Sequence, residues 1–262
     1  MAAIVLTITS GKGGVGKTTA TANLALALAD IGKKVVCIDS DIGLRNLDVV
    51  MGLENRIVYD LIDVVEGRCK LKQAMIHDKR MQELYLIPAA QTRDKNAISP
   101  QQMVKLCDEL RPEFDWILID SPAGIERGFQ NAIAPADQVM VITNPDVSAV
   151  RDADRIIGLI DSQQKGPAKL VINRVNSSMV KRGEMLDVDD IMDLLAVKLI
   201  GIVPEDEHVV ISTNRGHPVV LEPKSKAGQA FRNIAHRLNG EEVPYLSLDE
   251  KEDIFKRLFG RR

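Results

Sequence analysis

The sequence contains few cysteines, and they are scattered along the chain. Its 262 residues include only three, Cys37, Cys69 and Cys107, and no two of them form a C-x-x-C pair. This spacing argues against a disulfide framework and against a local zinc knuckle. We therefore interpret all three as buried or incidental thiols.

Long apolar segments and a targeting segment are also missing. No apolar run approaches the roughly 18 residues that a membrane-spanning helix needs. The N-terminus lacks the basic region of a signal peptide, and the chain runs directly into a predicted strand. The sequence therefore predicts a cytoplasmic protein.

Strong charge of either sign is absent as well. The formal net charge is -3, with 27% charged and 45% hydrophobic residues. This balance gives no global attraction to nucleic acid, so we expect no specific nucleic-acid partner, and any basic surface must be local. Length and composition are typical of one globular domain with a large core.

Apolar, β-branched runs alternate along the chain with amphipathic helical patterns. The runs are Ala3–Thr9, Lys34–Asp39, Leu84–Pro88, Trp116–Asp120, Gln138–Thr143, Lys169–Asn173 and Leu199–Pro204. The helical patterns are Lys17–Ile31, Pro100–Leu110, Ser148–Ser162 and Val188–Leu195. Such alternation predicts an α/β fold, a mostly parallel, doubly wound sheet with helices on both faces, which binds ligands at the carboxyl ends of its strands.

A glycine-rich loop lies between the first run and the first helical pattern. Its spacing, G-x-x-x-x-G-K-T from Gly11 to Thr18, predicts a cradle whose backbone N–H groups converge on phosphate oxygens. Lys17 would reach the β- and γ-phosphates, and the Thr18 hydroxyl would bind Mg²⁺. An ordinary strand-to-helix turn is the alternative, but the full match favours a nucleoside triphosphate site. The predicted nucleotide-binding loop comprises Gly11, Lys12, Gly13, Gly14, Val15, Gly16, Lys17, Thr18 and Thr19.

A second lysine, Lys12, stands at the start of this loop, where a plain phosphate loop needs no charge. It fits a solvated surface lysine, or a cation that acts on the phosphates of a neighbouring subunit. The run K-G-G-V-G-K-T-T resembles the deviant Walker A (ParA/MinD) family of SIMIBI-type P-loop ATPases, which includes partition ATPases and the nitrogenase iron protein. The resemblance implies that Lys12 crosses a dimer interface and is catalytic together with Lys17.

Polar residues follow several predicted strands at the same edge of the sheet. Asp120 ends a buried strand, as a Walker B aspartate does, and would hold a magnesium-bound water; a strand-terminal turn residue would look similar. In the family the next loop senses the γ-phosphate, which implies that the backbone N–H of Gly124 approaches it.

The segment from Ile42 to Gly52 resembles the first switch of the division-site members of this family. A carboxylate beside a magnesium triphosphate is suited to orienting or deprotonating water. By resemblance we assign this catalytic role to Asp41, which would also belong to the metal site with Thr18 and Asp120. Asp39 and Asn46 would support the switch and the dimer contact.

Five residues at two strand ends match positions that flank adenine in the family. These are Asn173, Arg174, Pro204, Glu205 and Asp206. Ordinary strand-end turns would have the same composition, so this pattern leaves both readings open. ATP as the nucleotide rests on the resemblance, supported by the lack of an N-K-x-D-like guanine reader.

The last twelve residues are amphipathic and carry a net charge of +3. On a helix their four large apolar side chains fall within about 140°, which is typical of a helix in a membrane interface. A terminal helix docked on the domain would give the same pattern. The predicted membrane-contacting residues are Ile254, Phe255, Lys256, Arg257, Leu258 and Phe259.

We therefore expect an ATPase domain over residues 1–240, a linker over 241–250 and a membrane-targeting helix over 251–262. The resemblance extends along essentially the whole chain. It implies a Mg²⁺-dependent ATPase that forms a homodimer with ATP, binds anionic lipids on the cytoplasmic face of the inner membrane, and recruits the division inhibitor MinC to control septum placement. It also implies a hydrolysis-stimulating partner, MinE or another topological factor.

Other family members offer alternatives. A chromosome- or plasmid-partition ATPase would need a basic surface for DNA. A flagellar-placement ATPase usually has an N-terminal extension, which is absent from this sequence. An iron–sulfur reductase would need cysteines near Gly124 to bridge a cluster, and the sequence has none there.

Overall fold

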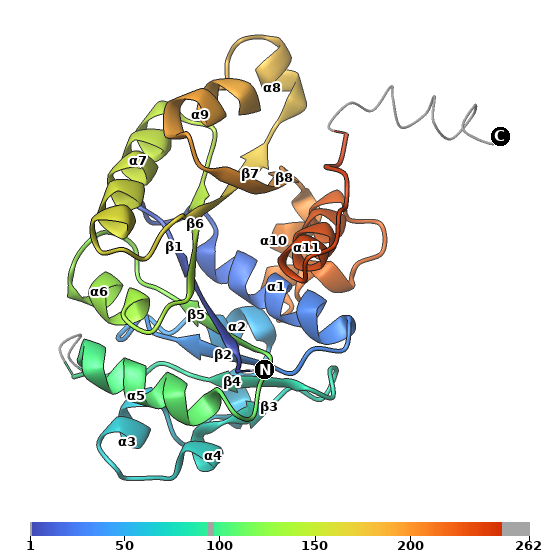
Figure 1. Cartoon of the computed structure of the whole chain (residues 1–262). Helices are drawn as coiled ribbons and strands as arrows, with labels where there is room; N and C mark the ends of the chain where they lie inside the picture. The colour runs from blue at the N-terminus through green and yellow to red at the C-terminus, as the bar shows by residue number, and fades with distance from the viewer. Residues whose placement is uncertain (1, 94–96, 248–262) are drawn as a thin grey trace.

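The β-branched runs form a central sheet covered by helices on both faces (Figure 1). This computed structural model describes residues 2–93 and 97–247. The strands are β1 (Ile4–Thr9), β2 (Val35–Asp39), β3 (Ile76–His77), β4 (Leu84–Ile87), β5 (Trp116–Asp120), β6 (Gln138–Thr143), β7 (Lys169–Val175) and β8 (Lys198–Pro204). Their order is β3-β4-β2-β5-β1-β6-β7-β8, and only the β3–β4 pair is antiparallel. The predicted fold class is confirmed.

Several helices begin at a side-chain cap. Ser99 and Gln102 form a capping box at the start of the helix whose first residue is Pro100, and Asp146 accepts from the N–H of Ala149 at another. The helices are α1 (Lys17–Asp30), α2 (Leu47–Met51), α3 (Leu61–Val65), α4 (Leu71–Ala74), α5 (Pro100–Leu110), α6 (Arg127–Ile133), α7 (Val147–Ser162), α8 (Ser177–Lys181), α9 (Val188–Leu195), α10 (Glu207–Asn214) and α11 (Lys226–Leu238), with 3₁₀ turns η1 (Glu54–Arg56) and η2 (Val219–Leu221).

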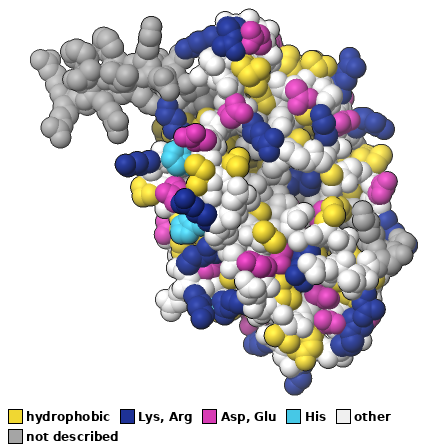
Figure 2. All heavy atoms as spheres, turned by 180° about the vertical axis from the view of Figure 1, so that it is seen from behind, with side chains coloured by type: hydrophobic (Ala, Val, Ile, Leu, Met, Phe, Trp, Pro, Cys, Tyr) yellow, Lys and Arg dark blue, Asp and Glu magenta, His cyan; other side chains and the backbone are white. Residues whose placement is uncertain are grey.

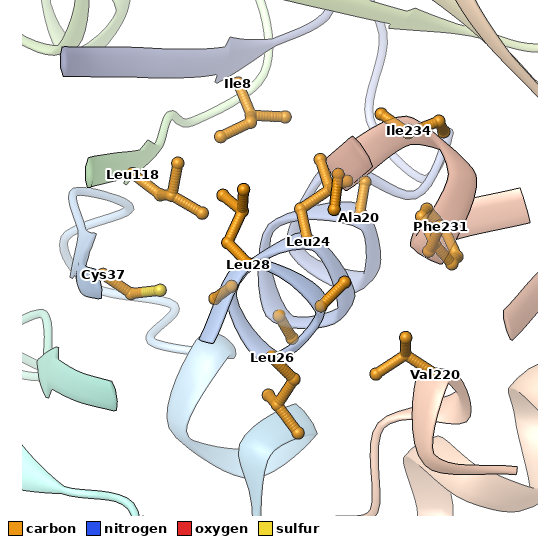
Figure 3. Close-up of a cluster of buried hydrophobic side chains, with 14 of the residues drawn as sticks. Ile8, Ala20, Leu24, Leu26, Leu28, Cys37, Leu118, Val220, Phe231 and Ile234 are labelled. Carbon is orange, nitrogen blue, oxygen red and sulfur yellow. The ribbon is translucent and has the colours of Figure 1, made fainter. Parts of the chain in front are cut away.

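The strands are apolar on both faces because both faces are covered. In β5, Leu118 belongs to the same core cluster as residues of α1 and α11, whereas Ile117 and Ile119 belong to the cluster that includes α5. Figure 3 shows Leu24 and Leu28 of α1 between the sheet and Phe231 of α11. Each such large side chain contributes about 1.5–3 kcal/mol when fully buried, so this packing holds α1 against the sheet.

Most elements of the sheet agree with the predicted runs, and two kinds of element were missed. The short β3 and several one- or two-turn helices leave no clear period in the sequence. Helix α11 was also missed, although it buries Phe231, Ile234 and Leu238 beside its small alanines. Within the described residues, no helix is both long and apolar enough to cross a membrane.

The topology gathers loops from distant parts of the sequence at one edge. Strand β1 lies between β5 and β6, and all three run in the same direction. The loops that follow β1, β2, β5, β6 and β7 therefore leave the sheet at its carboxyl edge, where open α/β sheets bind ligands.

Candidate nucleotide-binding site

The loop between β1 and α1 depends on glycine at two positions. Gly16 precedes α1 with a φ of 102°, a conformation that side chains disfavour, and a Cβ there would lie 2.4 Å from the Nδ2 of Asn173. A Cβ on Gly11 would lie 2.3 Å from the backbone O of Asp152 in α7. The glycines thus let the loop curl tightly against α7 and the end of β7.

This loop presents a row of backbone donors. In the part of the chain that the structure describes, no backbone N–H from Gly11 to Gly16 donates a hydrogen bond to another protein group. They precede the positive end of the α1 dipole, and backbone donors in this setting bind anions. The cradle therefore fits the phosphates of a nucleotide.

Lys17 is buried at the base of the loop. Its Nζ donates to the Ser10 hydroxyl at 3.0 Å, and only 9% of the residue is exposed. Burial lowers the pKa of Lys17, while the nearby carboxylates of Asp120 and Asp41 act in the opposite direction. An ammonium held in this desolvated place interacts strongly with any phosphate that enters the loop.

Asp120 faces the first turn of α1 from the end of β5. Thr21 donates to its Oδ1 at 3.3 Å, and the Thr18 hydroxyl also hydrogen-bonds to this carboxylate. Burial raises the pKa of Asp120, against these hydrogen bonds and the charge of Lys17. A hydroxyl and a carboxylate are hard oxygen ligands and fit Mg²⁺, which in nucleotide sites takes its other ligands from phosphates and water.

Metal binding by protein side chains alone is not indicated. Among the residues that the structure describes, no three His, Cys, Asp or Glu side chains are grouped to hold a metal ion. The predicted set of Thr18, Asp41 and Asp120 offers oxygen ligands that would hold Mg²⁺ together with the phosphates of a nucleotide.

Asp39 organises the segment that follows β2. It pairs in register with Asp120, and burial, followed by the repulsion from that carboxylate, raises its pKa. Its two oxygens accept from the N–H of Asp41 at 3.0 Å and from the N–H of Leu47 at 3.2 Å. Asp39 thus shapes the turn at Asp41 and caps α2, while Asn46 lies exposed beside it.

Lys12 lies at the rim of the loop and contacts the start of α7. Its Nζ donates to the Ser148 hydroxyl at 2.8 Å and lies 3.8 Å from the Oδ1 of Asp146, with 47% of the side chain exposed. Burial by itself would raise the pKa of Asp146. Hydrogen bonds from Ala149 and Ser148 and the charge of Lys12 outweigh burial, so the pKa of Asp146 is lowered. The sequence offered no signal for these partners, which are more than 130 residues away.

Three exposed apolar side chains were also missed. Leu44, Ile125 and Val147 lie on the segments that follow β2, β5 and β6, and their exposed fractions are 63%, 44% and 56%. A large apolar residue in a loop beside a predicted ligand site was the available signal, because exposed apolar groups often mark an interface.

The loop after β5 closes against the phosphate loop. The N–H of Gly124 donates to the backbone O of Ser10 at 3.2 Å, and Gly124 has a φ of 91°. The sequence predicts that this N–H approaches a γ-phosphate. In this structure the Gly124 N–H bonds to the Ser10 oxygen instead, so contact with a phosphate would require this segment to rearrange.

Asn173 and Arg174 occupy different environments at the end of β7. The Asn173 side chain is buried and donates through Nδ2 to the backbone O of Val15 at 2.7 Å, which supports the phosphate loop. Arg174 is exposed and has a φ of 58°. One N–H of the Asn173 amide is thus used by the loop, and the predicted base contact of this pair would use Arg174, the backbone or the remaining amide groups of Asn173.

The second predicted base-flanking group is engaged in local structure. Glu205 accepts from the Nδ2 of Asn176 at 2.9 Å, directly after Pro204 ends β8. The Asp206 carboxylate caps α10, accepting from the His208 N–H at 2.9 Å, and also accepts from the Ser225 hydroxyl before α11 at 2.7 Å.

These contacts explain the acidity of Asp206. Burial alone would raise its pKa, but the hydrogen bonds, chiefly from Ser225 and His208, lower the pKa of Asp206 to about 2. Any contact between this group and a base uses atoms other than the occupied carboxylate lone pairs.

The six residues predicted to contact a membrane, Ile254 to Phe259, lie outside the described residues.

Comparisons with known proteins agree with this geometry. The CobQ/CobB/MinD/ParA nucleotide binding domain matches residues 6–219. The septum site-determining protein MinD of Bacillus subtilis (strain 168) is 54% identical over 248 residues, covering 94% of this chain and 92% of the relative.

Two solved structures are similar over most of their length. A chain of the MinC:MinD cell division protein complex of Aquifex aeolicus has a TM-score of 0.88 and 51% identity, covering 94% of this chain and 99% of that chain. MinD of Pyrococcus horikoshii OT3 complexed with Mg-ADP has a TM-score of 0.81 and 29% identity, covering 90% and 96%.

The position of Asn173 leads to a prediction about its role. Asn173→Ala removes the support of the phosphate loop, and the loss of one buried hydrogen bond should weaken ADP and GDP binding by a similar factor, about tenfold. Calorimetric titration of both nucleotides measures this, and Arg174→Ala is compared as the exposed residue of the pair, whose loss would change the preference between the bases instead. A change confined to one nucleotide would instead assign Asn173 to base recognition.

Proposed function

This chain belongs to the CobQ/CobB/MinD/ParA family and, within it, to the septum site-determining MinD proteins, and on that premise we propose that it is an ATPase that controls placement of the division septum. The observation that carries the proposal is the phosphate loop with its two lysines, in a chain about half identical to such proteins over nearly its whole length. A partition or flagellar-placement role in the same family is the alternative.

The hydrolysis chemistry follows from the groups around the loop. The unpaired N–H groups of the loop and the buried Lys17 bind and neutralise the phosphates. Thr18 and Asp120 would hold Mg²⁺, which supplies charge neutralisation on the β- and γ-phosphate oxygens. Asp41 orients the attacking water or accepts its proton. Its carboxylate lies near the phosphate loop, since its charge acts to raise the pKa of Lys17.

Dimerisation would complete the site. Lys12 stands at the rim in a half-exposed pair with Asp146, and such surface pairs contribute only about 0–1 kcal/mol, so the lysine can be released to the phosphates of a second copy. The apolar Leu44, Ile125 and Val147 on the same edge support a face that two copies share. We therefore propose an ATP-dependent homodimer.

Membrane association is assigned to the C-terminal segment. We keep the division into an ATPase domain (1–240), a linker (241–250) and a membrane-targeting helix (251–262) as part of the proposal. One short amphipathic segment binds a bilayer reversibly, whereas two segments in one dimer bind through effective concentration. ATP would thus place the protein on the cytoplasmic face of the inner membrane, and hydrolysis would release it.

Partners of the ATP dimer follow from the relatives. The solved complex of MinC and MinD from Aquifex aeolicus supports a MinC-like division inhibitor as the partner of this chain. We propose in addition a partner that stimulates hydrolysis, MinE or another topological factor. On the face that Figure 2 shows, acidic and basic side chains are interspersed, which does not favour that face as a DNA-binding surface.

The two lysines of the loop should have separable effects. Lys17→Ala should abolish tight nucleotide binding, because the buried ammonium faces the phosphates in every state. Lys12→Ala should leave nucleotide affinity of the monomer nearly unchanged and abolish dimerisation and turnover. Nucleotide titration and analytical ultracentrifugation with ATP compare the variants. A Lys12→Ala protein that dimerises and hydrolyses ATP normally would exclude the role in trans.

Asp41→Ala should separate binding from hydrolysis. Loss of a group that handles the attacking water slows hydrolysis by about 10²–10⁴-fold and need not prevent ATP binding. Single-turnover hydrolysis and nucleotide affinity are measured on the same preparation, with Asp39→Ala as the neighbour whose loss disturbs the switch turn. An unchanged single-turnover rate would assign the role to another group.

Removal of residues 251–262 should uncouple the ATPase from the membrane. The truncated protein should bind ATP and unfold at the same temperature as the full chain, and its ATP-dependent co-sedimentation with anionic vesicles should disappear. Phe255→Glu should approach the same result, since it places a charge where acyl chains are met. Lower thermal stability of the truncated protein, with vesicle binding independent of ATP, would identify a docked structural helix. DNA co-sedimentation is the control for a partition role.

A further inference from the structure

The chain that follows α11 is fastened to β8 by one arginine. The Arg237 guanidinium donates to the backbone oxygens of Val243 at 2.8 Å, Pro244 at 2.8 Å and Ile200 at 2.9 Å. It also stacks on the ring of Tyr245 at 4.2 Å from the centroid. This fork uses most of the donors of the side chain, and it joins the first part of the predicted linker to the edge strand of the sheet.

Two further contacts extend this attachment. The Tyr245 hydroxyl donates to the backbone O of Leu199 at 2.8 Å, and Leu246 packs partly buried against the core cluster shared by α1 and α11. Residues 243–246 are therefore held at the amino-terminal end of β8. Lys251, where the predicted amphipathic segment begins, is only five residues further along the chain.

Two lysines lie at this same end of the sheet. Lys169 begins β7 and Lys198 begins β8, and the two residues pair in register. Among the described residues, no carboxylate lies within ion-pair distance of either lysine, and the Lys169 Nζ donates to the neutral Oε1 of Gln138 at 2.5 Å. Like charges side by side on neighbouring strands disfavour folding, so the pair gains from an anionic partner.

The electrostatic setting of Lys169 agrees with this reading. The residue is partly buried, and burial, followed by the charge of Lys198, lowers its pKa. Lys198 is exposed and stands next to Leu199, whose backbone holds Tyr245. The pair is thus accessible from solvent on the side of Lys198.

We propose that Lys169 and Lys198 form a second membrane contact, which binds anionic phospholipid head groups beside the root of the C-terminal amphipathic segment. This inference rests on the proposed membrane function of that segment. The occupant is a lipid because the attachment through Arg237 holds residues 243–246, from which the chain leads into the proposed membrane segment, at the end of the sheet that carries this pair. The bound nucleotide is excluded as the occupant, since its site lies at the opposite, carboxyl edge of the sheet.

The two contacts reinforce each other through the short connection. A basic side chain near an anionic bilayer strengthens binding by about fivefold, and a partly buried lysine contributes less. Because the root of the segment is attached to β8, insertion of the segment brings the lysine pair to the head groups at high effective concentration. The lysines also limit how the domain is oriented on the membrane.

The test uses full-length protein with ATP and vesicles of phosphatidylcholine with or without phosphatidylglycerol. The double variant Lys169→Gln/Lys198→Gln should bind the anionic vesicles about tenfold more weakly and neutral vesicles as wild type does. The double variant Lys169→Arg/Lys198→Arg should retain binding. Lys105→Gln, an exposed lysine of α5, is the matched control and should have no effect. ATPase activity and dimerisation should be unchanged in all of these variants.

A flexible Gly-Ser insertion after Ser247 tests the connection. Once the segment is no longer held close, the effect of the double glutamine variant should fall to about twofold or less. Equal binding of wild type and the double glutamine variant to anionic vesicles would overturn the inference while leaving the membrane function in place. Wild-type protein that binds no vesicle with ATP would overturn the membrane function itself, and the inference with it.

Discussion

The structure depends most on a group of charges buried at the carboxyl edge of the sheet. The register of β2 and β5 places Asp39 beside Asp120, and α1 brings the Lys17 ammonium to the same place. Burial raises the pKa of both carboxyl groups and lowers the pKa of the lysine. These charged forms are costly without partners, so the packed strands and α1 must hold them together. A ligand that carries both phosphates and a cation is suited to this site, because the phosphates would pair with the lysine and the cation with the carboxylates.

The same group connects the phosphate site to its surroundings. The Asp39 carboxylate accepts from the N–H groups of Asp41 and Leu47, on either side of the exposed Leu44. A change in the charge or position of Asp39 would therefore alter the conformation of this segment. On the other side, Lys12 reaches α7 through Ser148. The carboxyl edge therefore offers a physical route from bound nucleotide to an interface. The amino edge, where Arg237 fastens the chain to β8, offers an attachment point for the C-terminal segment.

The sequence by itself determined the fold class and the phosphate loop. The β-branched runs identified the main strands, and the spacing from Gly11 to Thr18 identified the loop, because both signals are local and are set by backbone geometry and period. The acidic residues at strand ends were also visible, since parallel strands bring such ends to one edge. The family that the phosphate loop resembles is the same family that the comparisons identify.

Tertiary structure decided which of those residues meet, and with which atoms. Asn173 donates to the phosphate loop, Lys12 donates to Ser148, and the Asp206 carboxylate caps α10 and accepts from Ser225 before α11. The sequence and the family resemblance named these residues for the nucleotide site but gave no sign of these partners. The attachment by Arg237 was likewise invisible. These contacts join residues that strand order and helix packing bring together, and hydrogen-bond geometry over such separations leaves no periodic trace in the sequence.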